Sequence, residues 1–213
     1  GKTKLTSIAF DGVGKNPGIY TVTPKNASIE GISSGWEWAW AYDLNYHSGT
    51  LIINGVIYVD NLQDYNYDGG PHQAVPVVKL VDNTSVSSSN YTVDYKRDGV
   101  TTTDFTSAGE ITVIVTGKTA NYYTGVKTLT YNILEGQMTV TGNNYSGTYD
   151  GQPHTVTATP SVTDGTTVEY STDNTNWSET APTWTNVTNG AQLVYIRATN
   201  PNYSDSTCTY TLT

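Results

Sequence analysis

The chain has 213 residues, of which 14% are charged, and a net charge of −9, so it lacks the basic footprint that nucleic acid or an anionic membrane surface requires. A single cysteine excludes an internal disulfide framework, and no stretch approaches the roughly 20 apolar residues of a membrane span. Tyr outnumbers Phe by 17 to 2, which suits half-buried strands and predicts an all-β fold.

Residues 1–55 form the first predicted module. Its expected strands are Leu5–Phe10, Ile19–Pro24, Trp36–Tyr42 and Thr50–Ile53. About 55 residues with few large aliphatic side chains are marginal for an independent core. We therefore expect that residues upstream complete this module or that it leans on the next one.

Residues 56–135 form the second predicted module. Its mostly apolar run Val75–Leu80 contains Pro76, which predicts an edge strand. Alternation predicts strands at Tyr91–Tyr95, at 111–116 with Ile111, Val113 and Val115 on one face, and at 129–133 as the last strand.

Residues 136–213 form the third predicted module. Its expected strands are Val156–Thr159, Val168–Ser171, Leu193–Ala198 and Cys208–Leu212, preceded by an opening segment with Met138 and Val140. Cys208 takes the position of Leu129 in the repeat, which predicts an inert buried thiol. Short strands separated by turn signals, with no helix between them, predict immunoglobulin-like β-sandwiches in tandem, with β-grasp-like sheets as the alternative.

One phrase occurs twice, as Tyr67-Asp68-Gly69-Gly70-Pro71-His72 and again as Tyr149-Asp150-Gly151-Gln152-Pro153-His154. Repetition indicates a recurring structural unit, and we expect Tyr67 and Tyr149 to occupy equivalent places. The phrase contains an Asp and a His, but its residue types are typical of a turn: Asp for a local hydrogen bond, Gly for a positive φ, Pro for the exit. Two copies in one chain favour a scaffold over an active site.

The remaining chemistry is sparse. Asp173–Asn176 lacks the Gly and the terminal Glu of a calcium loop, and the chain has no nucleophile elbow or phosphate-binding glycine loop. His47 is expected in a solvated loop. These observations predict no enzyme, no metal and no cofactor.

The third module carries the motifs Tyr149-Asp150-Gly151, Glu169–Asp173, Trp177 and Arg197–Tyr203. Together these motifs resemble tandem immunoglobulin-like surface repeats of gut Firmicutes. The second module resembles a sister type through Asn90–Tyr95, Ala108-Gly109 and Asn121–Gly125, and residues 4–53 resemble the MBG/YDG class of bacterial adhesin repeats through Leu5–Ile8, Gly18–Val22, Asn45-Tyr46 and Gly49–Ile53. The resemblance implies a secreted or wall-attached multidomain protein with no catalytic residue.

One stretch departs from that family. Trp36, Trp38, Trp40 and Tyr42 alternate with Glu37, Ala39 and Ala41, so an extended strand would place four aromatic rings on one face. Such a row can stack sugar rings, by analogy with carbohydrate-binding modules. The alternative is that these rings build the core of an aliphatic-poor module or seal it against its neighbour.

The function expected is therefore a non-catalytic stalk or adhesin segment of a bacterial surface protein, and the alternative is a carbohydrate-binding module that uses the aromatic row. The partners expected are a glycan or a cell-surface protein of a host. We expect a monomer, cut from a longer extracellular protein that is wall-attached or secreted. The short joints Asn54-Gly55 and Glu135-Gly136 predict an extended rod.

Overall fold

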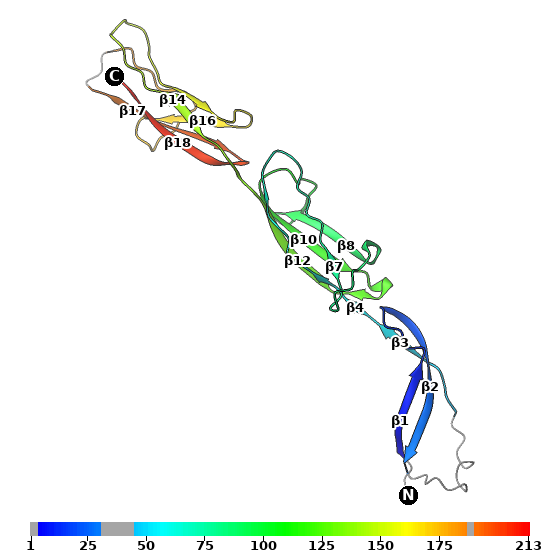
Figure 1. Cartoon of the computed structure of the whole chain (residues 1–213). Helices are drawn as coiled ribbons and strands as arrows, with labels where there is room; N and C mark the ends of the chain where they lie inside the picture. The colour runs from blue at the N-terminus through cyan, green and yellow to red at the C-terminus, as the bar shows by residue number, and fades with distance from the viewer. Residues whose placement is uncertain (1–3, 31–44, 187–189) are drawn as a thin grey trace, which may run out of the picture. The chain divides into compact units, whose positions relative to one another are not determined.

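The computed structural model describes residues 4–30, 45–186 and 190–213, and within these ranges the chain is all-β (Figure 1). The helical elements found there are two 3₁₀ turns, η1 (Ser88–Asn90) and η2 (Thr119–Asn121). No helix in these ranges is long and apolar enough to cross a membrane.

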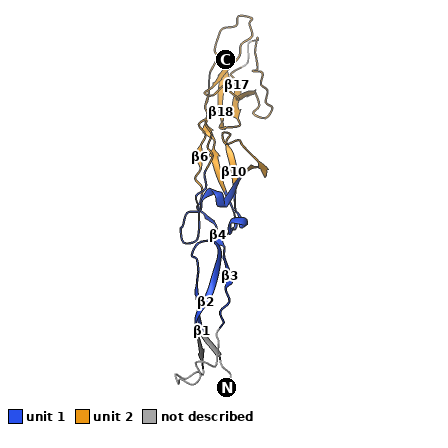
Figure 2. Ribbon diagram, turned by 90° about the vertical axis from the view of Figure 1, so that its right-hand side faces the viewer, with its two compact units in different colours: residues 1–61, 75–94, 113–129 blue, residues 62–74, 95–112, 130–213 orange. Residues whose placement is uncertain are grey.

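The chain divides into two compact units (Figure 2). Unit 1 holds residues 1–61, 75–94 and 113–129, and unit 2 holds residues 62–74, 95–112 and 130–213. Residues of the predicted second module, 56–135, occur in both units, so the three-module boundaries stay a prediction.

The strands wholly in unit 1 are β1 (Lys4–Asp11), β2 (Gly18–Glu30), β3 (Gly49–Ile53), β4 (Gly55–Val56), β5 (Tyr58–Val59), β7 (Val78–Lys79) and β11 (Tyr123–Thr124). Three strands have residues in both units: β8 (Tyr91–Arg97), β10 (Gly109–Gly117) and β12 (Val126–Leu134). Those wholly in unit 2 are β6 (Tyr65–Asn66), β9 (Val100–Thr101), β13 (Gly136–Gln137), β14 (Val140–Asn143), β15 (Thr157–Pro160), β16 (Thr167–Ser171), β17 (Gln192–Asn200) and β18 (Tyr203–Leu212).

Strands β1, β2 and β3 form an antiparallel sheet, as predicted for three of the four expected strands. Phe10, Ile19 and Ile52 on this sheet are at least half exposed. None of residues 7–27 and 45–54, for which burial is described, is fully buried. These residues by themselves therefore supply no buried core, and the dependence of the first module on other residues stays a prediction.

Elsewhere in unit 1, alternating side chains build a core. Ile57 and Val59 flank the exposed Tyr58, and Val113 and Val115 of β10 are fully buried. The predicted inward face of β10 is thus confirmed. The predicted strand Val75–Leu80 is wrong in extent, because strand pairing within it is limited to β7. Burial still alternates along this segment, in which Pro76 is buried.

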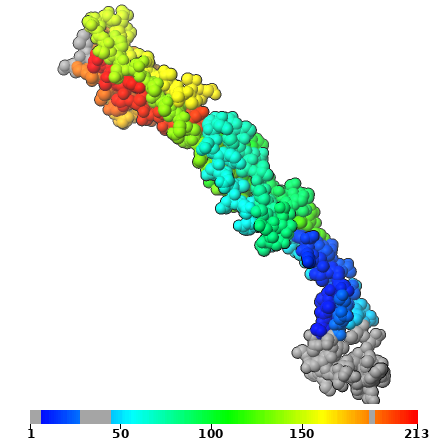
Figure 3. All heavy atoms as spheres, viewed as in Figure 1, coloured from blue at the N-terminus to red at the C-terminus, as the bar shows by residue number. Residues whose placement is uncertain are grey.

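The third module of unit 2 is a two-layer sandwich (Figure 1). One layer has the strand order β13-β18-β17-β16, and the other is the antiparallel pair β14-β15. Between them lies a core with the buried members Met138, Val140, Val156, Val194, Ile196, Ala198 and Leu212. In the space-filling view β14 borders β18 at the surface (Figure 3).

Strand order and direction make this sandwich immunoglobulin-like. Strands β16, β17 and β18 are consecutive antiparallel neighbours, while the first strand of the module, β13, runs parallel to β18. In the preceding part of unit 2, β6 runs parallel to the end of β12 in the same way. The fold class is therefore the predicted β-sandwich rather than the β-grasp alternative.

Candidate functional site

The predicted ligand row, Trp36, Trp38, Trp40 and Tyr42, lies outside the described residues. Its role as a binding platform stays a prediction. His47, which follows it, is exposed in a loop before β3, as predicted.

The two Tyr-Asp-Gly phrases form the same turn, and each turn contains the Asp–His pair. Asp68 Oδ1 accepts a hydrogen bond from the backbone N–H two residues ahead at 2.8 Å and lies 2.9 Å from His72 Nε2. Asp150 Oδ1 makes the same two contacts, at 2.9 Å to the backbone and 2.8 Å to His154 Nε2. An ionised carboxylate only accepts, so Nε2 carries the hydrogen in both pairs.

These contacts lower the pKa of both carboxyl groups below the usual 3.8, first through the backbone N–H and then through the imidazole. The glycine after each Asp has a positive φ, +81° at Gly69 and +74° at Gly151, which an L side chain would strain. The turn interpretation is confirmed at both copies.

A tyrosine ring also stacks on each histidine. The ring of Tyr65 stacks on His72 at 5.0 Å between centroids, and that of Tyr145 stacks on His154 at 4.3 Å. His154 is also fixed by its backbone, which exchanges two 2.9 Å hydrogen bonds with Trp184. Each Asp–His pair therefore fastens a turn to a sheet, and the imidazoles serve as structural contacts.

The two copies differ in register between the stacking tyrosine and the turn. The N–H of Tyr67, two residues after Tyr65, donates to the carbonyl of Leu134 at the end of β12. In the third module the corresponding donor is the N–H of Gly147, two residues after Tyr145. It donates to the carbonyl of Thr213. Tyr67 and Tyr149 are therefore equivalent relative to their Asp but not relative to the sheet, which corrects the prediction of equivalent places.

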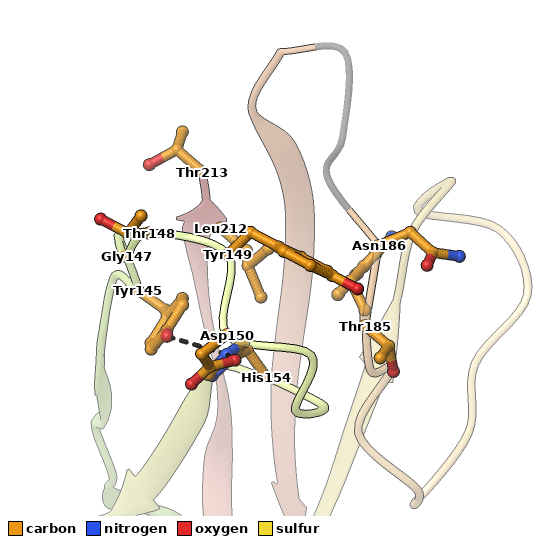
Figure 4. A pocket seen from close by; sticks show the side chains of 11 residues that line it. Tyr145, Gly147, Thr148, Tyr149, Asp150, His154, Thr185, Asn186, Leu212 and Thr213 are labelled. Carbon is orange, nitrogen blue, oxygen red and sulfur yellow. Dashed lines mark hydrogen bonds and ion pairs between the residues drawn. The ribbon is translucent and has the colours of Figure 1, made fainter.

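This two-residue insertion opens a hollow of about 120 Å³ beside β18. It is lined by rings of Tyr145, Tyr149 and Trp184 and by the polar residues Asp150 and Asn186. Figure 4 shows Tyr149 reaching across Leu212 toward Asn186. Tyr149 is 62% exposed, whereas Tyr67 is half-buried.

A second polar cluster lies on the outer face of the third module. Glu169 Oε2 accepts a 2.7 Å hydrogen bond from Arg197, whose guanidinium lies 4.5 Å from the ring centre of Trp177. The hydrogen bond to Glu169 raises the pKa of Arg197. The guanidinium is already paired with the Glu169 carboxylate and stacked on the Trp177 ring, so this cluster stabilises the sheet surface.

Two further expectations concern ligation and thiol chemistry. The Asp173 carboxylate accepts from the N–H groups of Thr175 and Asn176, which lower its pKa, so it caps its own loop. Within the described ranges no three His, Cys, Asp or Glu side chains are grouped to hold a metal. Cys208 is half-buried rather than buried, and burial raises the pKa of its thiol.

Sequence reasoning missed the stacking tyrosines, although the chain carries a signal for them. Both follow a residue with a short side-chain acceptor, as Asp64-Tyr65 and Asn144-Tyr145. Asp64 accepts from the N–H of Asn132 at 2.7 Å, and Asn144 accepts from the N–H of Thr211 at 2.9 Å. This repeated acceptor-Tyr pair attaches the start of each turn to the last strand of its module.

Neither known protein-family models nor curated proteins gave a match to the chain. Among solved structures, it is similar to titin Ig tandem domains A164-A165, with 10% identity over 74% of this chain and 96% of that one and a TM-score of 0.33. Drosophila OTK extracellular domains 3-5 match with 11% identity, 92% and 70% coverage, and a TM-score of 0.33. Mouse clustered PcdhgC3 EC1-3 matches with 12% identity, 91% and 76% coverage, and a TM-score of 0.28. With such low scores, the assignment of the fold rests on the strand order and core described above.

Proposed function

We propose that this chain is a non-catalytic extracellular spacer, a stalk or adhesin segment of a bacterial surface protein that spaces or presents a binding region. The observation that carries the proposal is a repeated joint. In each unit, a linker glycine is hydrogen-bonded to the Asn-Tyr segment near the end of the module that follows it. An array of modules joined in this way keeps its modules at a fixed spacing and needs no catalytic residue.

In unit 2 the joint is made by residues of three segments. The N–H of Gly136 donates to the carbonyl of Asn202 at 2.9 Å, and the Asn202 side chain accepts from the N–H of Ala108 at 2.9 Å. The ring of Tyr67 packs edge-on against that of Tyr203 at 5.2 Å. The contacts of Ala108 and Tyr67 join the third module to the residues before it, and the Gly136 bond fixes its first residue.

In unit 1 the corresponding glycine is Gly55, whose N–H donates to the carbonyl of Tyr122 at 2.8 Å. A Cβ added to Gly55 would lie 2.6 Å from the ring of Pro17 and 2.9 Å from Leu80. A Cβ added to Gly136 would lie 2.7 Å from the ring of Tyr203. A Cβ at either glycine would therefore displace a neighbouring side chain.

The bacterial and cell-surface parts of the proposal are supported by the resemblance to MBG/YDG-type adhesin repeats and to surface repeats of gut Firmicutes. Such a segment works outside the cell, wall-attached or secreted, and its partners are a glycan or a host surface protein. The Asp–His pairs support a non-catalytic role, since both imidazoles hold turns in place.

The test removes the ring at the joint. In the Tyr67→Ala variant we expect the third module to move independently, which broadens the distance distribution between spin labels on β12 and β17, with the melting temperature nearly unchanged. The matched control is Tyr58→Ala, whose ring is 51% exposed in unit 1. A distribution that is already broad in the parent chain would refute the spacer.

The second candidate function is carbohydrate binding through Trp36, Trp38, Trp40 and Tyr42, favoured by their alternation. If the row is a platform, each Trp→Ala change abolishes glycan binding on an array and leaves the melting temperature nearly unmoved. If the rings form core instead, each change costs roughly 3–5 kcal/mol and unfolds the first module. A large loss of stability in all three single variants would end the glycan proposal at this row.

A further inference from the structure

The end of the third module carries an aromatic surface on which Tyr149 is 62% exposed among the residues that the structure describes. We call it the Tyr149 face and define it by Tyr145, Gly147, Tyr149, Trp184 and Asn186. The Tyr149 ring stands over the 120 Å³ hollow beside the last strand (Figure 4). Exposing a ring costs stability that its burial would have contributed, so a surface of this kind calls for a partner.

The corresponding surface earlier in unit 2 shows which partner such a face accepts. There, β12 ends at Leu134 beside the Asp64-Tyr65 pair and the Tyr67 turn. On that surface the ring of Tyr203 of the following module packs against Tyr67, and the adjacent Asn202 accepts from the N–H of Ala108. The Tyr149 face has the same acceptor-Tyr pair, the same Asp–His turn and the same strand end.

We propose that the Tyr149 face docks the Asn-Tyr segment of a further β-module of this kind. This proposal rests on the spacer function. It adds a partner for the Tyr149 face, which the spacer function alone does not specify. The aromatic ring of the incoming segment would enter the hollow and pack edge-on against Tyr149, as Tyr203 packs against Tyr67. The incoming Asn would supply backbone and side-chain polar groups, as Asn202 does.

The insertion Gly147-Thr148 adapts this surface for a deeper contact. Gly147 takes the position that Tyr67 occupies in the other copy, so the ring beside Leu212 is supplied by Tyr149 instead. Tyr149 follows its stacking tyrosine by two residues more than Tyr67 does, and it forms one wall of the hollow. Asp150 is the one charged acidic group in this lining, and His154 already pairs with it, so the surface suits an uncharged polar-aromatic segment.

The experiment uses the full chain extended after Thr213 by a second copy of residues 135–213, which creates a new joint at the Tyr149 face. Spin labels on β17 of the third module and on β17 of the added copy report its rigidity. We expect a narrow distance distribution that Tyr149→Ala broadens, together with slowed amide exchange at the added copy of Gly136. Tyr67→Ala in the same chain is the matched control, and it should broaden only the internal joint.

A new joint that is equally mobile with and without Tyr149 would overturn the proposal, and the internal Tyr67 joint would show separately whether the spacer function fails with it. Tyr149→Ala in the unextended chain should leave the melting temperature unchanged, because its ring is exposed. Saturable binding of a monosaccharide to the unextended chain, lost in Tyr149→Ala while the new joint is unaffected, would assign the face to a sugar and also overturn the proposal.

Discussion

Aspartates that accept backbone hydrogen bonds recur in the turns of this chain. Asp68, Asp82, Asp104, Asp150 and Asp173 each accept from an N–H two residues ahead. In each case a backbone N–H is the main reason why the carboxyl pKa is lowered, the one three residues ahead for Asp104 and Asp173 and the one two residues ahead for the others. A charged acceptor makes such a bond stronger than a neutral one, so ionised aspartates stabilise these turns.

Asp104 gives the sharpest test of this role. Backbone N–H groups of Ser107 and Thr106, with the nearby Arg97, lower the pKa of its carboxyl to about 2. Because the folded pKa lies below the unfolded value of 3.8, its contribution is present above pH 4 and is lost progressively as the pH falls through the folded pKa of about 2. We expect Asp104→Asn to cost about 1 kcal/mol at pH 7, since water screens this half-exposed group.

The measurement is the denaturant midpoint of parent and variant between pH 2 and pH 7. The difference between them should shrink below pH 4 and should still be falling at pH 2, where half of the folded Asp104 carboxyl groups remain ionised. Glu179→Gln is the control, because Glu179 is exposed and makes no hydrogen bond within the part of the chain that the structure describes. A difference that is constant across the whole pH range would contradict the role given to the charge.

Strand β17 shows how alternation builds the third module at the scale of an element. Val194, Ile196 and Ala198 point into the core with no exposed surface, while the intervening Leu193 is 47% exposed. The strand continues two residues beyond the predicted Ala198, to Asn200, whose side chain donates to the carbonyl of Asp164 at 2.9 Å. The apolar pattern predicted the strand, and a polar side-chain contact extends it.

We expect Ile196→Ala to destabilise the third module by roughly 2–5 kcal/mol, because the neighbouring core side chains can only partly fill the cavity. Leu193→Ala, on the opposite face of the same strand, should cost less than about 1 kcal/mol. Urea unfolding of both variants measures the pair. Equal losses would show that the two faces of β17 are not as differently packed as their burial indicates.

The short joints make a prediction at the scale of the whole molecule. The predicted linkers Asn54-Gly55 and Glu135-Gly136 are each only two residues long, which leaves little slack between modules. We therefore predict an extended particle in solution. A compact chain of this length would have a radius of gyration of roughly 17 Å, and small-angle scattering should give a clearly larger value. A value near that of a sphere would refute the extended arrangement.

The sequence by itself determined much of the local structure, because period-2 alternation and turn residues act over a few neighbours. It placed β10, β17 and β18, the inward face of Ile111, Val113 and Val115, and both Tyr-Asp-Gly turns. It also predicted a sandwich from strand spacing alone. The strand predicted at Val75–Leu80 was wrong in extent, since alternating burial does not require ladder hydrogen bonds and Pro76 has no N–H to donate.

Only the tertiary structure decided what the recurring phrases do. The His72 and His154 rings stack on Tyr65 and Tyr145, and the joint at Gly136 depends on residues more than 60 positions away in the chain. A two-residue insertion kept the Tyr149 phrase intact while shifting it relative to the last strand, which no comparison of short motifs reveals. Contacts of this kind depend on which strands pair and in what register, and these are set by the packing of the whole module rather than by neighbours in sequence.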